Sequence, residues 1–178
     1  NTLSAIWKGW CDLQAVGLID RLPKVDCVQS TASAAISETV RQVRSDDLAA
    51  VDWSAIKVQE VSATTIADSI SVDRPRDGLA AVRAVIESGG EAVSVSDEEI
   101  LMAVPEMARA SGVFAEPAAA APWAGLKQLV RDNRIGSSER VVCVVSGSGL
   151  KDIASSRKAV GEPQLIEPSL EAVRKCRF

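Results

Sequence analysis

The pattern of apolar and polar residues predicts a chain in which helices and short strands alternate. Apolar residues three and four apart mark helices over residues 3–13, 32–44 and 79–86. Ser96 and Glu99 have the spacing of a capping box, so a further helix is expected to begin there. A last short helix is expected over 170–175.

Prolines set the expected limits of the next helices. Pro117 is well placed as the first residue of a helix that ends near 132–134. Pro105 falls inside the preceding helical pattern, where a proline costs about 3 kcal/mol, so we expect a kink or a break near Val104. Pro122 fits only if the helix restarts at that position.

Three segments are predicted to form strands. Residues 25–29 and 92–95 are short, and 141–145 (VVCVV) is an uninterrupted apolar run, typical of a strand buried on both faces of a parallel sheet. Residues 45–61 are mixed and polar, and we expect a loop with a turn or two of helix. The expected fold class is therefore α/β, with a mostly parallel sheet flanked by helices.

The composition and the net charge disfavour several classes of function. The 178 residues have a formal net charge of −4 and scattered basic residues, which disfavours binding to nucleic acid. The chain has no histidine, which removes Ser-His-Asp and Cys-His catalysis and the commonest zinc ligand, and no metal site is expected. Its four cysteines form no C-x-x-C pair, which favours buried free thiols in a reducing cytosol. No apolar run approaches the roughly 20 residues that cross a bilayer, so no membrane partner is expected.

Two places have the local chemistry of a ligand site. The loop 146–149 (SGSG) directly follows the predicted strand 141–145, and ligands of open α/β sheets bind beyond the carboxyl ends of strands. Asn1 and Thr2 lie at a helix N-terminus, whose unpaired N–H groups bind phosphate. Without further evidence, the simpler interpretation of the loop is a strand-to-helix turn, and the simpler interpretation of Asn1 is a helix cap that binds no ligand.

Two acidic positions also have two interpretations each. The run 97–99 is either a metal site or the acidic first turn of a capped helix, and the capped turn is simpler. Glu116 is either a buried functional carboxylate or a charge at a helix start.

Read in order, several segments resemble the threonine synthase family. The segments are NTLSAIWKGWCDLQAVGLIDRLP at 1–23, Gln29 at a strand end, TIADSI with Pro75, SGG followed by VSDEEI, GVFAEPAAAA, and VVCVVSGSGLKD. Each segment alone is only weakly specific for the family, but the order and spacing of the segments together are specific. The resemblance covers residue 1 to about residue 153. Ala119 departs from the family, which usually has serine there.

The resemblance implies a fold type II pyridoxal 5′-phosphate (PLP) enzyme of tryptophan synthase β-like architecture. Residues 1–178 would be the C-terminal part of its PLP-binding large domain. Asn1 matches the end of the family's phosphate loop, and Ser146 matches the residue whose hydroxyl hydrogen-bonds the pyridine nitrogen. The Schiff-base lysine belongs to the N-terminal half of the family, so no catalytic residue is expected among these residues. The start at Asn1, inside a predicted helix, also favours a fragment over a processed natural terminus.

The implied reaction converts O-phospho-L-homoserine and water to L-threonine and phosphate, in cytoplasmic threonine biosynthesis. The 178 residues alone are expected to be inactive, and a homodimer is a family expectation. Two alternatives stay open: another fold type II PLP enzyme, such as a threonine or serine dehydratase, and a non-catalytic α/β binding remnant.

Overall fold

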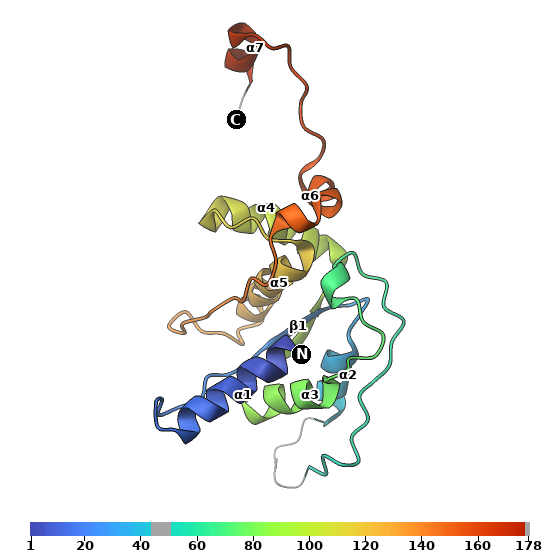
Figure 1. Cartoon of the computed structure of the whole chain (residues 1–178), viewed down its shortest axis with the longest axis vertical. Coiled ribbons are helices and arrows are strands. Elements are labelled where there is room, and N and C mark those ends of the chain that lie inside the picture. Colours follow the sequence, from blue (N-terminus) through green and yellow to red (C-terminus); the bar gives the residue numbers. More distant parts are fainter. Residues whose placement is uncertain (44–50, 177–178) are drawn as a thin grey trace.

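The computed structural model describes residues 1–43 and 51–176 (Figure 1). Its elements in chain order are α1 (Thr2–Ala15), β1 (Cys27–Ser30), α2 (Ala35–Val43), the 3₁₀ helix η2 (Asp68–Ile70), α3 (Gly78–Glu87), β2 (Ala92–Val95), α4 (Asp97–Ser111), α5 (Pro117–Arg131), the 3₁₀ helix η3 (Gly149–Lys151), α6 (Ile153–Val160) and α7 (Leu170–Lys175). Arg44, the predicted end of the second helix, and residues 45–50 of the predicted loop lie outside the described residues. Residues 51–61 of that loop contain no helix.

The sheet is parallel, as predicted. β1 pairs with β2, with Cys27 opposite Ala92 and Ser30 opposite Val95. The strand predicted at 25–29 is confirmed with shifted limits, since β1 begins two residues later and ends one residue later, and the strand predicted at 92–95 is confirmed in full. Parallel strands need a long connection, and here it contains α2 and α3. The α/β class is therefore confirmed.

Helices cover both faces of this sheet. Val28 of β1 and Val95 of β2 pack in one core cluster with α4 and α5, which we call the α4–α5 core. Cys27 and Ala92, the paired residues at the start of the two strands, pack instead with α2 and α3, in the α2–α3 core. The alternation follows from the strand geometry, because successive side chains point to opposite faces.

The predicted strand 141–145 is wrong. Residues 141–146 have no regular secondary structure, and Val142 is 87% exposed. A strand exists only where a neighbouring strand takes up its backbone hydrogen bonds, and the described residues provide no such neighbour for this segment. The run has the composition of a buried strand without the partner strand.

The break predicted near Val104 and the helix restart predicted at Pro122 are wrong, while a kink near Val104 stays a prediction. α4 continues through Pro105, and α5 continues through Pro122. The two helices pack against each other in the α4–α5 core, where Ile100 and Val104 meet the alanines at 118–121. Burial of these side chains offsets the roughly 3 kcal/mol that an interior proline costs. The small alanine side chains allow the helices to approach closely.

The capping box and the proline helix start predicted from the sequence are confirmed, and glycines end two other helices. Gly17 and Gly89 follow α1 and α3 with positive φ angles of 74° and 69°, the left-handed conformation that glycine adopts without strain. Ser96 and Glu99 form the capping box of α4, and Pro117 is the first residue of α5. The short helix at 170–175 is present as α7, whereas the sequence pattern does not predict α6.

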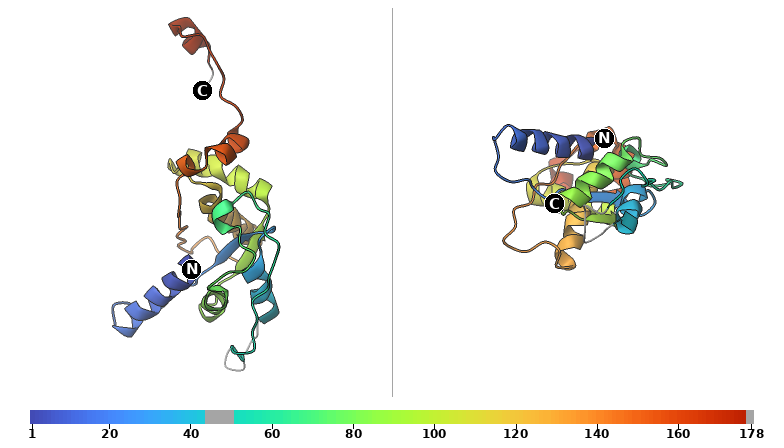
Figure 2. Two further views of the ribbon diagram at one scale, coloured as in Figure 1. Left: turned by 45° about the vertical axis from the view of Figure 1, so that its right-hand side comes forward. Right: turned by 90° about the horizontal axis from the view of Figure 1, so that it is seen from below.

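The C-terminal part leads away from the two cores. Figure 2 shows α6 beside α4, then an extended segment, and α7 beyond the rest of the molecule. None of the helices in residues 1–43 and 51–176 has the length and apolar character that crossing a membrane requires.

Candidate functional site

The SGSG loop is fixed to the segment that precedes α5. The backbone N–H of Glu116 donates to the carbonyl of Gly147 at 3.1 Å, and the N–H of Gly149 donates to the carbonyl of Phe114 at 2.9 Å. These bonds form a short antiparallel bridge. The loop is therefore more than a flexible turn, because backbone hydrogen bonds on both sides set its position.

The glycines of the loop are needed for this close approach. A Cβ atom at position 147 would lie 2.0 Å from Oε1 of Glu116, and a Cβ atom at position 149 would lie 2.4 Å from the ring of Phe114. Neither distance is possible for a real side chain. The backbone thus comes as near to its neighbours as glycine allows.

Ser146 precedes this fixed backbone and has a free hydroxyl. Its side chain is exposed, and its Oγ has no hydrogen-bond partner in residues 1–43 and 51–176. A hydroxyl group can donate one hydrogen bond and accept two. Ser146 therefore has the unused capacity that a ligand-binding hydroxyl requires.

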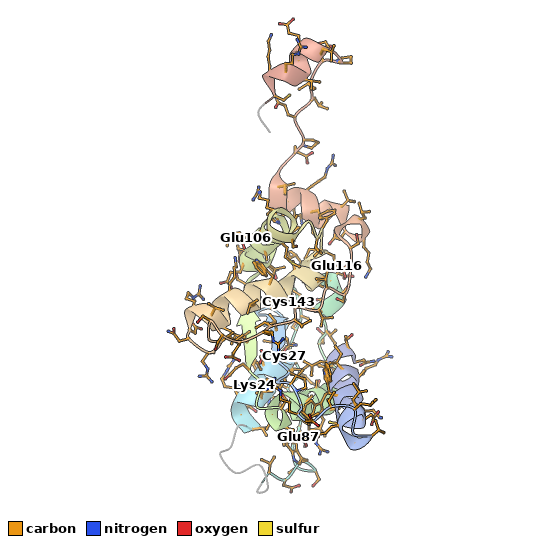
Figure 3. The ribbon with its side chains drawn as sticks, turned by 90° about the vertical axis from the view of Figure 1, so that its left-hand side faces the viewer. Lys24, Cys27, Glu87, Glu106, Glu116 and Cys143 are labelled. Atoms are coloured by element: carbon orange, nitrogen blue, oxygen red, sulfur yellow. The ribbon has the colours of Figure 1, made fainter. Side chains whose placement is uncertain are left out.

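Glu116 lies behind the loop as a buried carboxylate. Glu116 is 4% exposed. Lys151 Nζ lies 3.4 Å from Oε2 of Glu116, and Ser69 Oγ lies 3.4 Å from Oε1. The side chain does not cap α5. Glu116 is both buried and placed at the start of α5, so a functional role of its carboxylate stays a prediction. Figure 3 shows Glu116 where η2 and the chain leading to α6 meet.

Sequence reasoning missed the two partners of Glu116. Ser69 and Lys151 are 82 positions apart, yet their side chains are within 3.4 Å of each other. The available signal is that both residues fall in segments that resemble one family, TIADSI and GLKD. The cluster faces a cavity of about 300 Å³, whose lining residues are Asp68, Ser69, Glu116, Pro117, Ala118, Lys151 and Asp152.

Asn1 lies at the N-terminus of α1, as expected. It is the N-cap residue, it is exposed, and its side chain makes no capping hydrogen bond. It borders an open cavity of about 560 Å³ between α1 and the start of α3, whose other lining residues are Ser4, Ala5, Lys8, Arg76, Asp77 and Ala80. The first N–H groups of α1 have no intrahelical partner, which suits an anion.

The two predicted site residues do not line a common cavity. Asn1 borders the cavity at α1, and Ser146 borders neither of the two cavities described above. The convergence of Asn1 and Ser146 on one ligand therefore stays a prediction.

The acidic run 97–99 is the capped first turn of α4, which is the simpler of its two interpretations. Asp97 is also bonded beyond its own helix: its carboxylate accepts from the hydroxyl of Ser30 at 3.0 Å, from the hydroxyl of Thr65, and from the N–H of Ile66 at 2.9 Å. The side chain thus joins β1, the segment before η2, and α4. The described residues contain no group of three His, Cys, Asp or Glu side chains that could hold a metal ion.

The four cysteines are free thiols, as predicted, but only Cys27 is fully buried. Burial in the α2–α3 core raises the pKa of Cys27 to about 12, with a smaller contribution from the charge of Asp26. Partial burial also raises the pKa of Cys143, three positions before Ser146. Both thiols are labelled in Figure 3. A raised pKa disfavours the reactive thiolate, so neither cysteine is placed as a nucleophile.

The sequence matches the family described as pyridoxal-phosphate dependent enzymes over residues 1–147. It is 36% identical over 175 residues to a threonine synthase of Methanocaldococcus jannaschii, covering 98% of this chain and 41% of that protein. It is 36% identical over 178 residues to a threonine synthase of Methanosarcina acetivorans, covering 100% of this chain and 42% of that protein. The chain thus spans about two fifths of the length of these curated relatives.

Among solved structures, the fold is similar to that of a threonine deaminase from T.th. The TM-score is 0.50 at 17% sequence identity, and the match covers 79% of this chain and 47% of that one. At this identity the likeness concerns the fold alone, and it agrees with the fold type II α/β architecture expected from the sequence.

Proposed function

The chain belongs to the family of pyridoxal-phosphate dependent enzymes, and we propose that it forms part of a threonine synthase. The curated relatives named above carry that name at 36% identity over nearly all of this chain. The match to threonine deaminase has 17% identity and therefore does not favour a dehydratase. The reaction proposed for the whole protein is the conversion of O-phospho-L-homoserine and water to L-threonine and phosphate.

The observation that carries the proposal is the free hydroxyl of Ser146 on a fixed loop. Its Oγ has no partner in the described chain, while the next residues are fixed by backbone bonds to Phe114 and Glu116. The residues present fit PLP: a neutral hydroxyl suits a pyridine nitrogen, and the N–H groups of α1 next to Asn1 suit a phosphate.

These residues would bind and orient the cofactor. PLP, when bound, supplies an electron sink for chemistry at the amino-acid substrate. Ser146 would donate a hydrogen bond to the pyridine nitrogen and leave it largely unprotonated, whereas a carboxylate there would favour the protonated ring. Asn1 and the start of α1 would hold the phosphate. The proton-transferring lysine of the family is expected in the N-terminal half of the whole protein, so we infer that the chain by itself is inactive.

We further propose that the described residues are the C-terminal part of a larger PLP-binding domain. The run 141–145 is apolar and has no regular secondary structure, with Val142 87% and Val144 47% exposed. Burial of such a run is favourable by about 25 cal/mol per Å², and a neighbouring strand would also take up its backbone groups. The rest of the domain would supply that strand. The family expectations of a cytoplasmic location and a homodimer belong to the same proposal.

The test uses the full-length protein, because the whole reaction is proposed for it. Purified protein is assayed with O-phospho-L-homoserine, L-threonine and L-serine in the presence of PLP. We expect L-threonine and phosphate to form from O-phospho-L-homoserine, and no ammonia or 2-oxo acid to form from L-threonine or L-serine. Selective deamination of threonine or serine would instead establish the dehydratase alternative, and a protein that neither binds PLP nor reacts would favour the non-catalytic remnant.

Ser146→Ala tests the residue that carries the proposal. Loss of one hydrogen bond to the cofactor should weaken PLP binding about tenfold and slow turnover. Ser138→Ala is the matched control, because Ser138 is also an exposed serine in a segment without regular structure. If Ser146→Ala binds PLP and turns over like the control, Ser146 does not contact the cofactor.

A further inference from the structure

We propose that Glu116 is a positioning residue for the SGSG loop. With Lys151 and Ser69 it fixes the backbone at Gly147, and so directs the hydroxyl of Ser146 toward the ring of PLP. This inference rests on the proposed function and adds to it a residue that does not itself touch the cofactor.

Glu116 contacts the loop in two independent ways. Its backbone N–H donates to the carbonyl of Gly147 at 3.1 Å. Its carboxylate fills the space beside the same residue, since a Cβ atom at position 147 would lie 2.0 Å from Oε1. Backbone and side chain of one residue thus set the position of Gly147. Ser146 is the preceding residue, so the direction of its side chain depends on that position.

The carboxylate itself is held in place from two other segments. Ser69 Oγ of η2 lies 3.4 Å from Oε1, and Lys151 Nζ at the end of η3 lies 3.4 Å from Oε2. Lys151 Nζ also lies 3.4 Å from the Ser69 hydroxyl, which closes the cluster. A buried carboxylate is stable only when such partners compensate its lost hydration. Removal of the charge should therefore loosen the contacts among η2, the start of α5 and the loop.

An ordinary role in capping the helix does not explain this side chain. Glu116 is the N-cap residue of α5, but its carboxylate accepts no hydrogen bond from the first turn. The side chain points instead toward the loop and toward the cavity of about 300 Å³ that it shares with Lys151. The carboxylate is therefore placed to act on the loop, and through it on Ser146.

The experiment compares Glu116→Gln and Glu116→Ala with wild type in the full-length protein. Glu167→Gln is the matched control, because Glu167 is exposed and its side chain has no partner in the described chain. Three quantities are measured: the dissociation constant of PLP, the visible circular dichroism per bound PLP, and hydrogen exchange of the segment 141–151 without PLP. The dichroism reports how the ring is held, which overall stability does not determine.

We expect Glu116→Ala to raise the dissociation constant of PLP about tenfold, lower the visible dichroism and speed exchange of the loop. Glu116→Gln should recover part of each effect, because its amide keeps the shape and one acceptor while losing the charge opposite Lys151. If Glu116→Ala does not fold, the glutamine variant alone decides. Wild-type values in both variants, or in the glutamine variant alone if only that one folds, would overturn the inference.

Binding of PLP by the wild-type protein distinguishes failure of the proposed function from failure of the positioning role. A wild-type protein that binds no PLP refutes the function, and with it the role of Glu116 toward a cofactor. A wild-type protein that binds PLP, together with Glu116 variants that leave dichroism and loop exchange unchanged, refutes only the positioning role.

Discussion

The carboxylate of Glu116 and the backbone of Gly147 share one space: a Cβ atom at position 147 would lie 2.0 Å from Oε1 of Glu116 and 2.4 Å from its Cδ. Because Glu116 is 4% exposed, the carboxylate cannot move into solvent without disturbing its neighbours. Gly147→Ala should therefore displace the loop, destabilise the protein by about 1–3 kcal/mol and weaken the binding of PLP. Urea unfolding and PLP titration measure the two effects.

Gly9→Ala is the control for this substitution. Gly9 lies within α1, and a methyl group added there would have no atom within 4 Å, so alanine should stabilise the protein by about 0.5–1 kcal/mol. A double variant tests the shared space directly. Glu116→Ala removes the side-chain atoms that a Cβ atom at position 147 would meet. In a protein that already carries Glu116→Ala, Gly147→Ala should therefore lower the free energy of unfolding by less than it does in the wild type. Strict additivity of the two changes would contradict the shared space.

Asp97 offers a second test, of the junction between the sheet and α4. It accepts hydrogen bonds from Ser30, Thr65 and the N–H of Ile66. Asp97→Asn replaces one acceptor oxygen by a donor, so at least one of these groups loses its partner, at a cost of about 1.5–3 kcal/mol. The free energy of unfolding is compared with that of Glu98→Gln, a change in the same helical turn. Equal stability of the two variants would show that the Asp97 bonds contribute little.

The sequence predicts the features whose causes are local. The Ser96–Glu99 box acts within one helical turn and lies where expected. Position 116 has two interpretations in the sequence, because burial of its carboxylate depends on residues far along the chain. Its partner Ser69 is 47 positions away, and no periodicity connects the two.

The wrong predictions concern features that depend on contacts between distant segments. The run 141–145 has strand composition, but a strand also needs a partner, which composition does not report. Pro105 and Pro122 break helices in isolation, yet packing in the α4–α5 core keeps α4 and α5 continuous. In each case a contact between distant segments, or its absence, decides the outcome.

Asp152 gives a prediction that depends on pH. Its carboxylate accepts from the N–H of Ser155 at 3.0 Å, which caps α6. That hydrogen bond is the largest cause that lowers the pKa of Asp152, and the Ser155 hydroxyl and Lys158 lower it further. A lowered pKa means that the charged form stabilises the folded state. This contribution is complete above the pKa of the unfolded carboxyl, about 3.9, and is lost as the pH falls through the lower pKa of the folded state.

We therefore expect Asp152→Ala to destabilise α6 by about 0.5–2 kcal/mol at pH 7 and by less at pH 2–3. Asp152→Asn is the matched control, since asparagine caps helices well but does not titrate. Hydrogen exchange of the amides of α6 across this pH range measures the effect. A difference between Asp152→Ala and wild type that does not shrink on acidification would show that the charge of Asp152 does not stabilise the cap.

The last prediction concerns Cys27, whose pKa burial raises to about 12. At pH 8 about 10⁻⁴ of such a thiol is ionised, and only the thiolate reacts with alkylating reagents. Cys27 should therefore stay unlabelled by iodoacetamide in the native protein while the partly exposed Cys11 is labelled, as mass spectrometry of peptides would show. In urea both should react at similar rates, because the pKa of Cys27 returns to its ordinary value on unfolding. Since Cys27 packs beneath the sheet among α2 and α3, its native labelling rate measures how often that core opens. Labelling of Cys27 as fast as Cys11 under native conditions would contradict its burial.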